Sequence, residues 1–251
     1  MQDSNPVSTP ADINVKLLKY DGISKPVDSK KYQAMVGSLL YASVATRPDI
    51  AQAVSEVSKY NSCPTEAHLT AVKRIIRYIK GTLTTKLCYN KSDETKVIGY
   101  SDANWAGDLD NRCSTSGNVF LMSGGAVSWQ SKRQNTVAVS TAEAEYVSLF
   151  HATQEAMWLH KLLNDIDGKD AHMPTTCMVD NQAAIAIAKN TATKSRTKHI
   201  DIKYHFLREA VANGHILIKY CPSADMTADI LTKPLCRARF VVHRQNMGLT
   251  D

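Results

Sequence analysis

The amino-acid sequence predicts an α/β protein in which helices pack against a mixed β-sheet that follows a small helical region. Three observations predict this class. Apolar residues recur at helical spacing between residues 31 and 80. From residue 96 onward three extended segments follow one another across short turns, and after residue 141 helical and extended segments alternate. A meander followed by such alternation is typical of a mixed sheet with helices against it.

The segment in front of the sheet is predicted to be a flexible lead-in followed by three helices. Residues 1–30 are rich in Pro, Ser and Asp and lack periodicity, which is typical of a poorly ordered segment. Helices are expected over 32–45, 48–60 and 65–80, and Gly81 ends the last one. Four basic residues lie beside the apolar stripe of the third helix. They indicate either contacts with a phosphate backbone or a solvated helix face.

The sheet and its helices are expected along the rest of the chain. In chain order, we expect a strand at 96–105, two strands over 117–132 around a Ser-Gly-Gly turn, an extended piece at 136–140, a helix over 141–166, a strand at 175–180, a helix over 181–190, a helix over 201–213, a strand at 215–221 and a short helix near Thr227. No internal repeat interrupts this order.

The composition excludes several classes of protein. The chain has 251 residues, with 30 Lys and Arg against 24 Asp and Glu. This excludes a disordered, collagenous or strongly anionic protein, and the formal charge of +6 permits nucleic-acid binding without proving it. The six cysteines form neither a CxxC pair nor a zinc-site spacing, which favours reduced thiols inside a cell. No apolar run is long enough for a signal peptide or a membrane span, so we expect no membrane partner.

Two acidic residues stand where the local pattern predicts an apolar side chain. Asp102 shares one face of its strand with Ile98 and Tyr100, although an acid that starts a turn is the alternative. Glu145 lies on the apolar stripe of its helix, and burying a lone carboxylate is costly unless it is neutralised, paired or bound to a metal. Glu143 lies beside that stripe, where an acid suits the first turn of a helix.

Asp180 and Asp229 complete a set of four acids. Asp180 follows an apolar strand end, where a helix N-cap is the alternative, and Asp229 lies in the short helix after the last strand, where a first-turn acid is ordinary. At one edge of the sheet, four carboxylates would repel one another unless a hard cation neutralised them. Oxygen ligands without cysteine favour Mg²⁺ or Mn²⁺. Two such ions ~4 Å apart promote in-line displacement at phosphorus, so the set predicts a nuclease.

Longer sequence strings carry a resemblance to a known family. The strings are YSDANWAGDLDNRCSTSG, VSWQSKRQNTVAVSTAEAEYVSL, VDNQAAIAIAKN, RTKHIDIKYHFLRE and ADILTKPL. They strongly resemble the ribonuclease H domain of copia-type long-terminal-repeat retrotransposon Pol polyproteins. The strings YQAMVGSLLYASVATRPDIAQAV and HLTAVKRIIRYIKGT are similar to the segment that joins reverse transcriptase to ribonuclease H, so the resemblance covers the chain from about residue 31.

The resemblance implies a ribonuclease H-like α/β fold with a five-stranded mixed sheet, its first three strands antiparallel, flanked by helices. The implied domains are a flexible lead-in at 1–30, a helical reverse-transcriptase connection segment at 31–95, a ribonuclease H-like domain at 96–240 and a C-terminal tail at 241–251. The implied activity is hydrolysis of the RNA strand of RNA–DNA hybrids during reverse transcription, with two Mg²⁺ ions or Mn²⁺ as a substitute. The catalytic metal ligands carry over as Asp102, Glu145, Asp180 and Asp229.

The resemblance also implies partners. They are an RNA–DNA hybrid and the reverse-transcriptase portion of the same polyprotein, in the cytoplasm within a virus-like particle or in the nucleus; the oligomeric state stays open. The hybrid is expected to be recognised by shape rather than by base sequence. The residues expected to contact it are Asn104, Ser140 and Gln182 beside the acids, and Lys132, Arg133, Lys194, Arg196 and Lys198 along the backbone. Solvated loop charge is the alternative for the basic residues, and a place in the core is the alternative for Trp105, a further candidate.

Two further features bear on function. His199 is either a substitute for the histidine that assists product release in the wider fold, or a brace for the helix that follows it. The sequence contains no reverse-transcriptase palm motif of the YVDD type, so this chain by itself is not expected to polymerise DNA. The alternative function is a catalytically weak nucleic-acid-binding or assembly module, in which residues 31–95 dock the polymerase.

Overall fold

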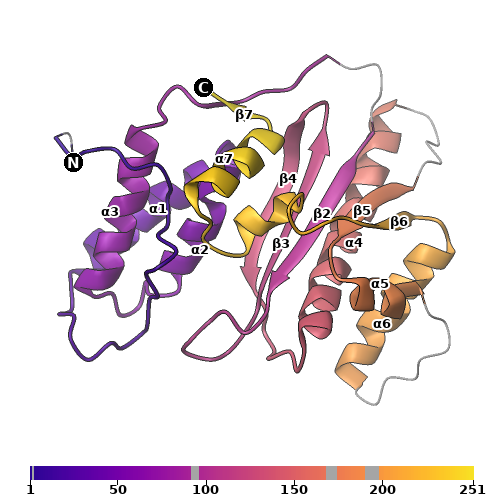
Figure 1. Cartoon of the computed structure of the whole chain (residues 1–251), viewed down its shortest axis with the longest axis horizontal. Coiled ribbons are helices and arrows are strands. Elements are labelled where there is room, and N and C mark those ends of the chain that lie inside the picture. The colour runs from indigo at the N-terminus through magenta and orange to yellow at the C-terminus, as the bar shows by residue number, and fades with distance from the viewer. Residues whose placement is uncertain (2, 92–95, 168–173, 190–197) are drawn as a thin grey trace.

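A five-stranded mixed sheet forms the centre of the protein in the computed structural model, which describes residues 1, 3–91, 96–167, 174–189 and 198–251 (Figure 1). In chain order the elements are α1 (Ser29–Ala45), the 3₁₀ helix η1 (Pro48–Ile50), α2 (Ala51–Ser58), α3 (Glu66–Lys80), β1 (Lys86–Leu87), β2 (Ile98–Asn104), β3 (Thr115–Met122), β4 (Gly125–Arg133), α4 (Thr141–Asp167), β5 (Thr175–Val179), α5 (Gln182–Lys189), α6 (Lys198–Ala212), β6 (Ile216–Tyr220), the 3₁₀ helix η2 (Thr227–Leu231), α7 (Arg237–Asn246) and β7 (Leu249–Thr250).

The strand order is β4-β3-β2-β5-β6. Strands β2, β3 and β4 pair antiparallel, while β5 lies parallel to β2 and β6 parallel to β5. This is the five-stranded mixed sheet, with its first three strands antiparallel, that the resemblance implies, so the predicted ribonuclease H-like fold is confirmed. One local expectation is wrong, because residues 136–140 form no strand.

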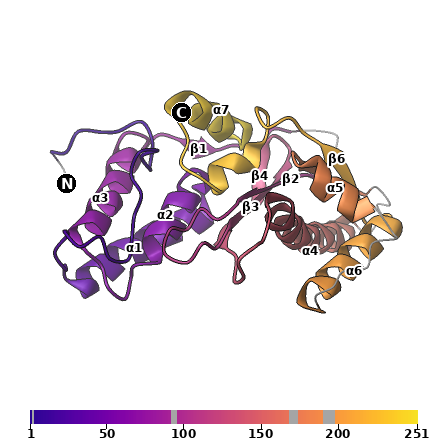
Figure 2. The same cartoon turned by 60° about the horizontal axis from the view of Figure 1, so that its bottom comes forward.

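The two faces of the sheet are buried by different helices. Neighbouring residues of a strand point to opposite faces, and on β3 Val119 contributes to one apolar cluster and Phe120 to another. Helix α4 covers the Phe120 face, where Tyr146 and Leu149 join that cluster. Figure 2 shows α4 on one side of the sheet and α7 with η2 on the other. The sheet is therefore the middle layer of three.

The Val119 face shares its core with the helices of residues 31–80. Val54 of α2 and Val72 of α3 are fully buried in the same cluster as Leu231 of η2 and Phe240 of α7. Residues on both sides of the expected domain boundary at residue 95 therefore belong to one apolar core. The domain division stays a prediction. The expected tail at 241–251 begins inside α7 and ends in β7, which pairs with β1.

The N-terminal residues 1–28 lie along the helices of the following segment (Figure 1). The described residues of this stretch, 1 and 3–28, form no helix or strand beyond an isolated bridge between Pro26 and Thr65. Their backbone nevertheless makes specific contacts, because the Tyr60 hydroxyl donates to the carbonyl of Leu17 at 3.1 Å and the Lys19 amide donates to the Asp110 carboxylate. Hydrogen bonds such as these attach the lead-in to the rest of the fold.

All six cysteines are free thiols. Among the helices in the described part of the chain, none combines the length and the apolar character that crossing a membrane requires.

Candidate active site

Asp102 and Asp180 meet because β2 and β5 are parallel and in register. The last residue pair of the two strands joins Tyr100 to Met178. Asp102 lies two residues beyond Tyr100, and Asp180 lies two residues beyond Met178. Since side chains two residues apart share a face, the register places both carboxylates at the same edge of the sheet. Asp102 is 2% exposed there.

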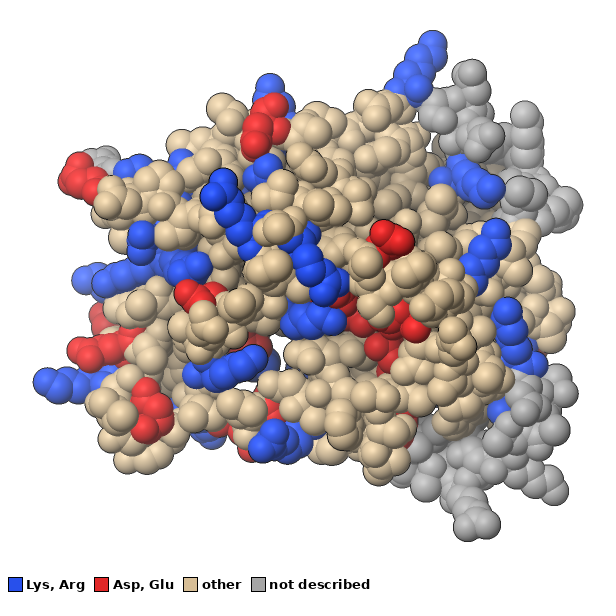
Figure 3. All heavy atoms as spheres, viewed as in Figure 1, with Lys and Arg blue, Asp and Glu red and all other residues tan. Residues whose placement is uncertain are grey.

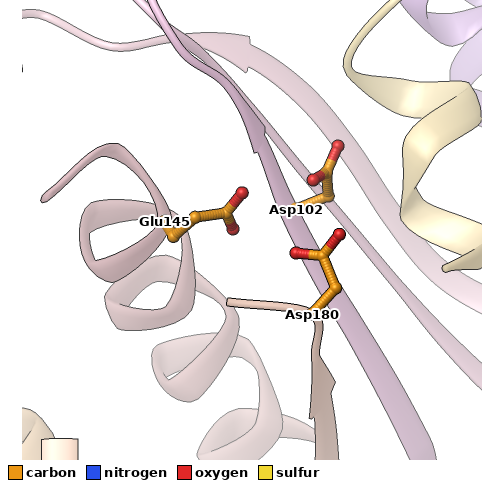
Figure 4. A group of neighbouring side chains, drawn as sticks. All are labelled: Asp102, Glu145 and Asp180. Carbon is orange, nitrogen blue, oxygen red and sulfur yellow. The ribbon is translucent and has the colours of Figure 1, made fainter. Parts of the chain in front are cut away.

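Helix α4 supplies the third carboxylate from Glu145. The Ser140 hydroxyl accepts a hydrogen bond from the Glu143 amide at 3.2 Å, and the Glu143 carboxylate accepts one from the Val139 amide at 2.8 Å. Glu143 therefore stabilises the start of the helix. Glu145 lies two residues later and is 6% exposed. One oxygen each of Asp102, Glu145 and Asp180 lies within 4.8 Å of the others, and the three side chains point toward one another (Figure 4).

Asp180 is free to face this group because its neighbour caps the next helix. The Asn181 side-chain oxygen accepts a hydrogen bond from the Ala184 amide at 3.0 Å, which is the N-cap interaction of α5. The alternative of Asp180 as the N-cap is therefore wrong. One Asp180 oxygen accepts a hydrogen bond from the Ser223 hydroxyl at 2.7 Å.

Asp229 lies in η2 and is not one of the three converging carboxylates. It is 1% exposed, and its two oxygens bind Lys233 Nζ at 2.7 Å and an Arg239 guanidinium nitrogen at 2.6 Å. Lys233 Nζ also lies 4.0 Å from an oxygen of Asp102, and that oxygen accepts a hydrogen bond from the Thr232 hydroxyl. Asp229 is thus linked to Asp102 through Lys233.

A glycine allows η2 to lie this close to the sheet. Gly117 of β3 pairs with Asp102 of β2. A Cβ atom at residue 117 would lie 2.6 Å from the Thr232 methyl group and 2.9 Å from the Leu231 Cβ. Any larger side chain at this position would push η2 away from the sheet.

Burial and mutual repulsion control the charge of the three carboxylates. Burial raises the pKa of Glu145 to about 10, with further contributions from the charges of Asp102 and Asp180. Burial also raises the pKa of Asp102 to about 6, although Lys233 opposes this shift. Burial lowers the pKa of Lys233, but the charges of Asp102 and Asp229 outweigh it, so the pKa is raised overall. Without a cation, the site therefore retains protons.

The donor set fits a hard divalent cation. Glu145 Oε2 is buried and has no hydrogen-bond partner. An unpartnered buried carboxylate oxygen is costly, and a cation among the three carboxylates would remove that cost. All the available ligand atoms in the group are oxygens, which suits Mg²⁺ or Mn²⁺ better than zinc.

The other residues predicted to contact substrate surround this group to different degrees. Asn104 ends β2, two residues after Asp102, and Gln182 is exposed at the start of α5. Ser140 is exposed, but its hydroxyl caps α4. The indole nitrogen of Trp105 donates to the Ala138 carbonyl at 3.0 Å while the side chain stays 45% exposed, so Trp105 is not a core residue.

The predicted phosphate-binding residues are only partly described. Lys132 is exposed at the end of β4, and Arg133 lies 3.4 Å from the Asp108 carboxylate. Lys194 and Arg196 lie outside the described residues, and the side chains of Lys198 and His199 do so as well. Figure 3 shows acidic side chains near the middle of one face, with Lys and Arg side chains beside them.

The sequence reasoning missed Lys233 and Arg239, which hold Asp229. A signal for Lys233 existed, because residues four apart on a helix are neighbours and Asp229 and Lys233 have this spacing. No comparable signal pointed to Arg239, since it reaches Asp229 from a separate helix.

The sequence relatives of this chain include two plant transposon polyproteins. The chain is 41% identical over 255 residues to the "Retrovirus-related Pol polyprotein from transposon TNT 1-94" of Nicotiana tabacum, covering 99% of this chain and 19% of the relative. It is 39% identical to the corresponding polyprotein from transposon RE1 of Arabidopsis thaliana, covering 100% of this chain and 17% of the relative. The chain thus spans less than a fifth of the length of these relatives. No family model matches.

Among solved structures, a ribonuclease H1 isolated from compost covers 55% of this chain and 94% of its own, with 17% sequence identity and a TM-score of 0.42. The fold is assigned from the observed strand order and not from this similarity.

Proposed function

We propose that this chain, which belongs to the copia-type family of retrovirus-related transposon Pol polyproteins, hydrolyses the RNA strand of RNA–DNA hybrids during reverse transcription. The chain spans only a small part of its relatives, so the proposal rests on its own site. The observation that carries it is the convergence of Asp102, Glu145 and Asp180, with one Glu145 oxygen buried and unpartnered. An oxygen-only anionic site at a sheet edge suits divalent-ion-dependent phosphodiester hydrolysis.

Two Mg²⁺ ions, or Mn²⁺ in their place, are the proposed cofactors. Asp102, Glu145 and Asp180 would hold one ion, and Asp102 with Asp229 would hold the other. When bound, such ions lower the pKa of a water molecule and offset negative charge on the leaving oxygen. The protein contributes fixed positions, because the four carboxylates lie on β2, on α4, just after β5 and in η2, all of which pack in one sheet-and-helix unit.

The surrounding residues are proposed to hold the hybrid. Asn104 lies two residues after Asp102 and Gln182 two residues after Asp180, and we propose that their amides contact the sugars and phosphates near the cleaved bond. The exposed Lys132 and the neighbouring Arg133 are proposed to contact phosphates of the backbone. Roles in substrate binding for Ser140, Arg196, Lys198 and His199 stay predictions.

The test is cleavage of a labelled hybrid by the purified chain with Mg²⁺. We expect cleavage of the RNA in the hybrid but not of single-stranded RNA, and loss of cleavage on addition of EDTA. Asp102→Asn and Glu145→Gln should abolish cleavage. Glu143→Gln is the matched control, because it removes a carboxylate from the same helix turn that does not join the group. Wild-type cleavage no faster than that of Asp102→Asn would refute the enzymatic proposal.

One observation favours a docking role for the helical segment as well. Leu40, Tyr41 and Val44 lie on one side of α1 and are 48%, 79% and 69% exposed. The proposed occupant of this apolar face is the reverse-transcriptase portion of the same polyprotein. Tyr41→Ser should weaken capture of a separately purified reverse-transcriptase portion and leave hybrid cleavage unchanged. Equal capture by the wild type and the variant would argue against this face.

A further inference from the structure

The carboxylate site is asymmetric, because basic side chains contact Asp229 on one side, whereas Asp102, Glu145 and Asp180 converge on the other. On the Asp229 side, both oxygens of that residue form ion pairs, Oδ1 with Lys233 at 2.7 Å and Oδ2 with Arg239 at 2.6 Å, although Oδ1 accepts no hydrogen bond. On the other side, Asp102, Glu145 and Asp180 face one another, and Glu145 Oε2 has no partner. A cation entering among Asp102, Glu145 and Asp180 meets the unpartnered Glu145 Oε2, whereas a cation entering at Asp229 meets two oxygens that already form ion pairs.

Lys233 is the group that lies between the two aspartates. Its Nζ is 2.7 Å from Asp229 and 4.0 Å from Asp102, which places a positive charge between the two carboxylates that would share the second ion. Arg239 lies on the opposite oxygen of Asp229, and no ion pair joins it to Asp102 among the described residues. Lys233 is therefore the basic residue whose position competes with that ion.

Lys233 is also able to leave this position. Its side chain is 38% exposed and ends a flexible four-carbon stem, so the ammonium group can move into water while Thr232 and the backbone of η2 stay in place. The planar guanidinium of an arginine would be harder to displace, because it forms several directed hydrogen bonds with a carboxylate at once.

We propose that Lys233 is a tethered cation that neutralises Asp102 and Asp229 in the ion-free protein and must be displaced before the second divalent ion binds. The proposal rests on the proposed function, since it concerns the same carboxylates. It makes Lys233 a positioning residue that keeps η2 against the sheet without an ion. It also makes ion binding unequal, with a tighter first ion at Asp102, Glu145 and Asp180.

The experiment is a Mn²⁺ titration of the full chain, followed by electron paramagnetic resonance of the free ion and repeated calorimetrically with Mg²⁺. The wild type should bind two ions with clearly different affinities. Lys233→Met should tighten the weaker step by about tenfold or more, because a unit charge ~4 Å away repels a dication strongly. Lys233→Arg should not tighten it. Asp229→Asn should remove the weaker step and leave the tighter one, which assigns the steps.

A matched control removes the same charge from another buried ion pair. Lys59 Nζ lies 3.2 Å from the buried Asp108, so Lys59→Met should leave both Mn²⁺ steps unchanged. Circular dichroism establishes that each variant is folded. Equal second-step affinities in the wild type and Lys233→Met would overturn the Lys233 proposal while leaving the nuclease proposal intact. Absence of any bound ion in the wild type would overturn both.

Discussion

Glu145→Gln should stabilise the ion-free protein at alkaline pH. The pKa of Glu145 is raised from an ordinary value of 4.5 to about 10, first by burial and then by the charges of Asp102 and Asp180. The folded state therefore binds a proton that the unfolded state releases throughout this interval. A group with a raised folded-state pKa contributes stability below its unfolded pKa, and this contribution is lost as pH rises toward the folded pKa. Glutamine keeps the shape and never ionises.

The magnitude follows from the same interval. Glu145 ionises at pKa 4.5 in the unfolded chain and at about 10 in the folded protein. At ~1.4 kcal/mol per pKa unit, this difference lowers the wild-type free energy of unfolding at about pH 8 by at most about 5 kcal/mol. Buried groups respond with an effective dielectric well above that of dry protein, so we expect Glu145→Gln to recover about 2 kcal/mol or more. Below about pH 4 the gain should disappear, because the wild-type side chain is then largely protonated in both states.

Urea unfolding in EDTA between about pH 6.5 and pH 9 measures this difference. Above pH 6, Asp102 contributes little to the pH dependence of the unfolding free energy, because its pKa is raised only to about 6. The wild type should lose stability across this range and Glu145→Gln should not. Glu143→Gln should keep the wild-type slope and lose only about 1 kcal/mol or less, as for a helix-start interaction. If the unfolding free energies of the wild type and Glu145→Gln fell in parallel with pH, the reasoning would be refuted. It would also be refuted if the wild-type slope in saturating Mg²⁺ equalled the slope in EDTA while ion binding was demonstrated independently.

Three further predictions concern the surroundings of the site. Arg47→Met should destabilise the fold by about 3 to 5 kcal/mol in urea unfolding, because it leaves the buried Asp49 carboxylate without its cationic partner at 2.8 Å and, among the described residues, with only the Tyr78 hydroxyl as a donor. Adding Asp49→Leu should restore most of the loss, and a single variant costing under ~1 kcal/mol would contradict the prediction. Gly117→Ala should cost about 1 to 3 kcal/mol and slow hybrid cleavage, since it pushes Thr232 away from the sheet; an unchanged cleavage rate would contradict it. Lys132→Ala should weaken hybrid binding and reduce the slope of log affinity against log salt by about 1, and an unchanged slope would show that Lys132 contacts no phosphate.

The sequence predicts the elements and three converging acids because both depend on local patterns. Residues two apart on a strand share a face, so Asp102 and Asp180 need only the parallel register of β2 and β5 to meet. The helical period separates Glu145 from Glu143 in the same way. Asp229 differs, because its surroundings depend on how η2 and α7 pack, and no pattern within either segment specifies that Arg239 reaches it.

The C-terminal elements show the same limit. Helix α7 has many polar residues and buries Phe240, His243 and Arg244, so its apolar periodicity is weak. Strands β1 and β7 are two residues each, and their pairing joins Leu87 to Leu249 across most of the chain. Two-residue strands have no recognisable alternation, and contacts between residues so far apart leave no local trace in the sequence.

The helical segment before the sheet helps to position Asp229. Ile230 and Leu231 of η2 are buried in the same cluster as Val54 and Val72 of the preceding helices. Asp229 precedes these two residues directly, so the packing that buries them also sets the distance between Asp229 and the sheet. Glu145 instead comes from α4, which packs on the opposite cluster through Tyr146 and Leu149. Loosening the helical segment should therefore disturb Asp229 and its contact with Lys233 before it disturbs Glu145, and we expect it to affect the proposed weaker ion-binding step first.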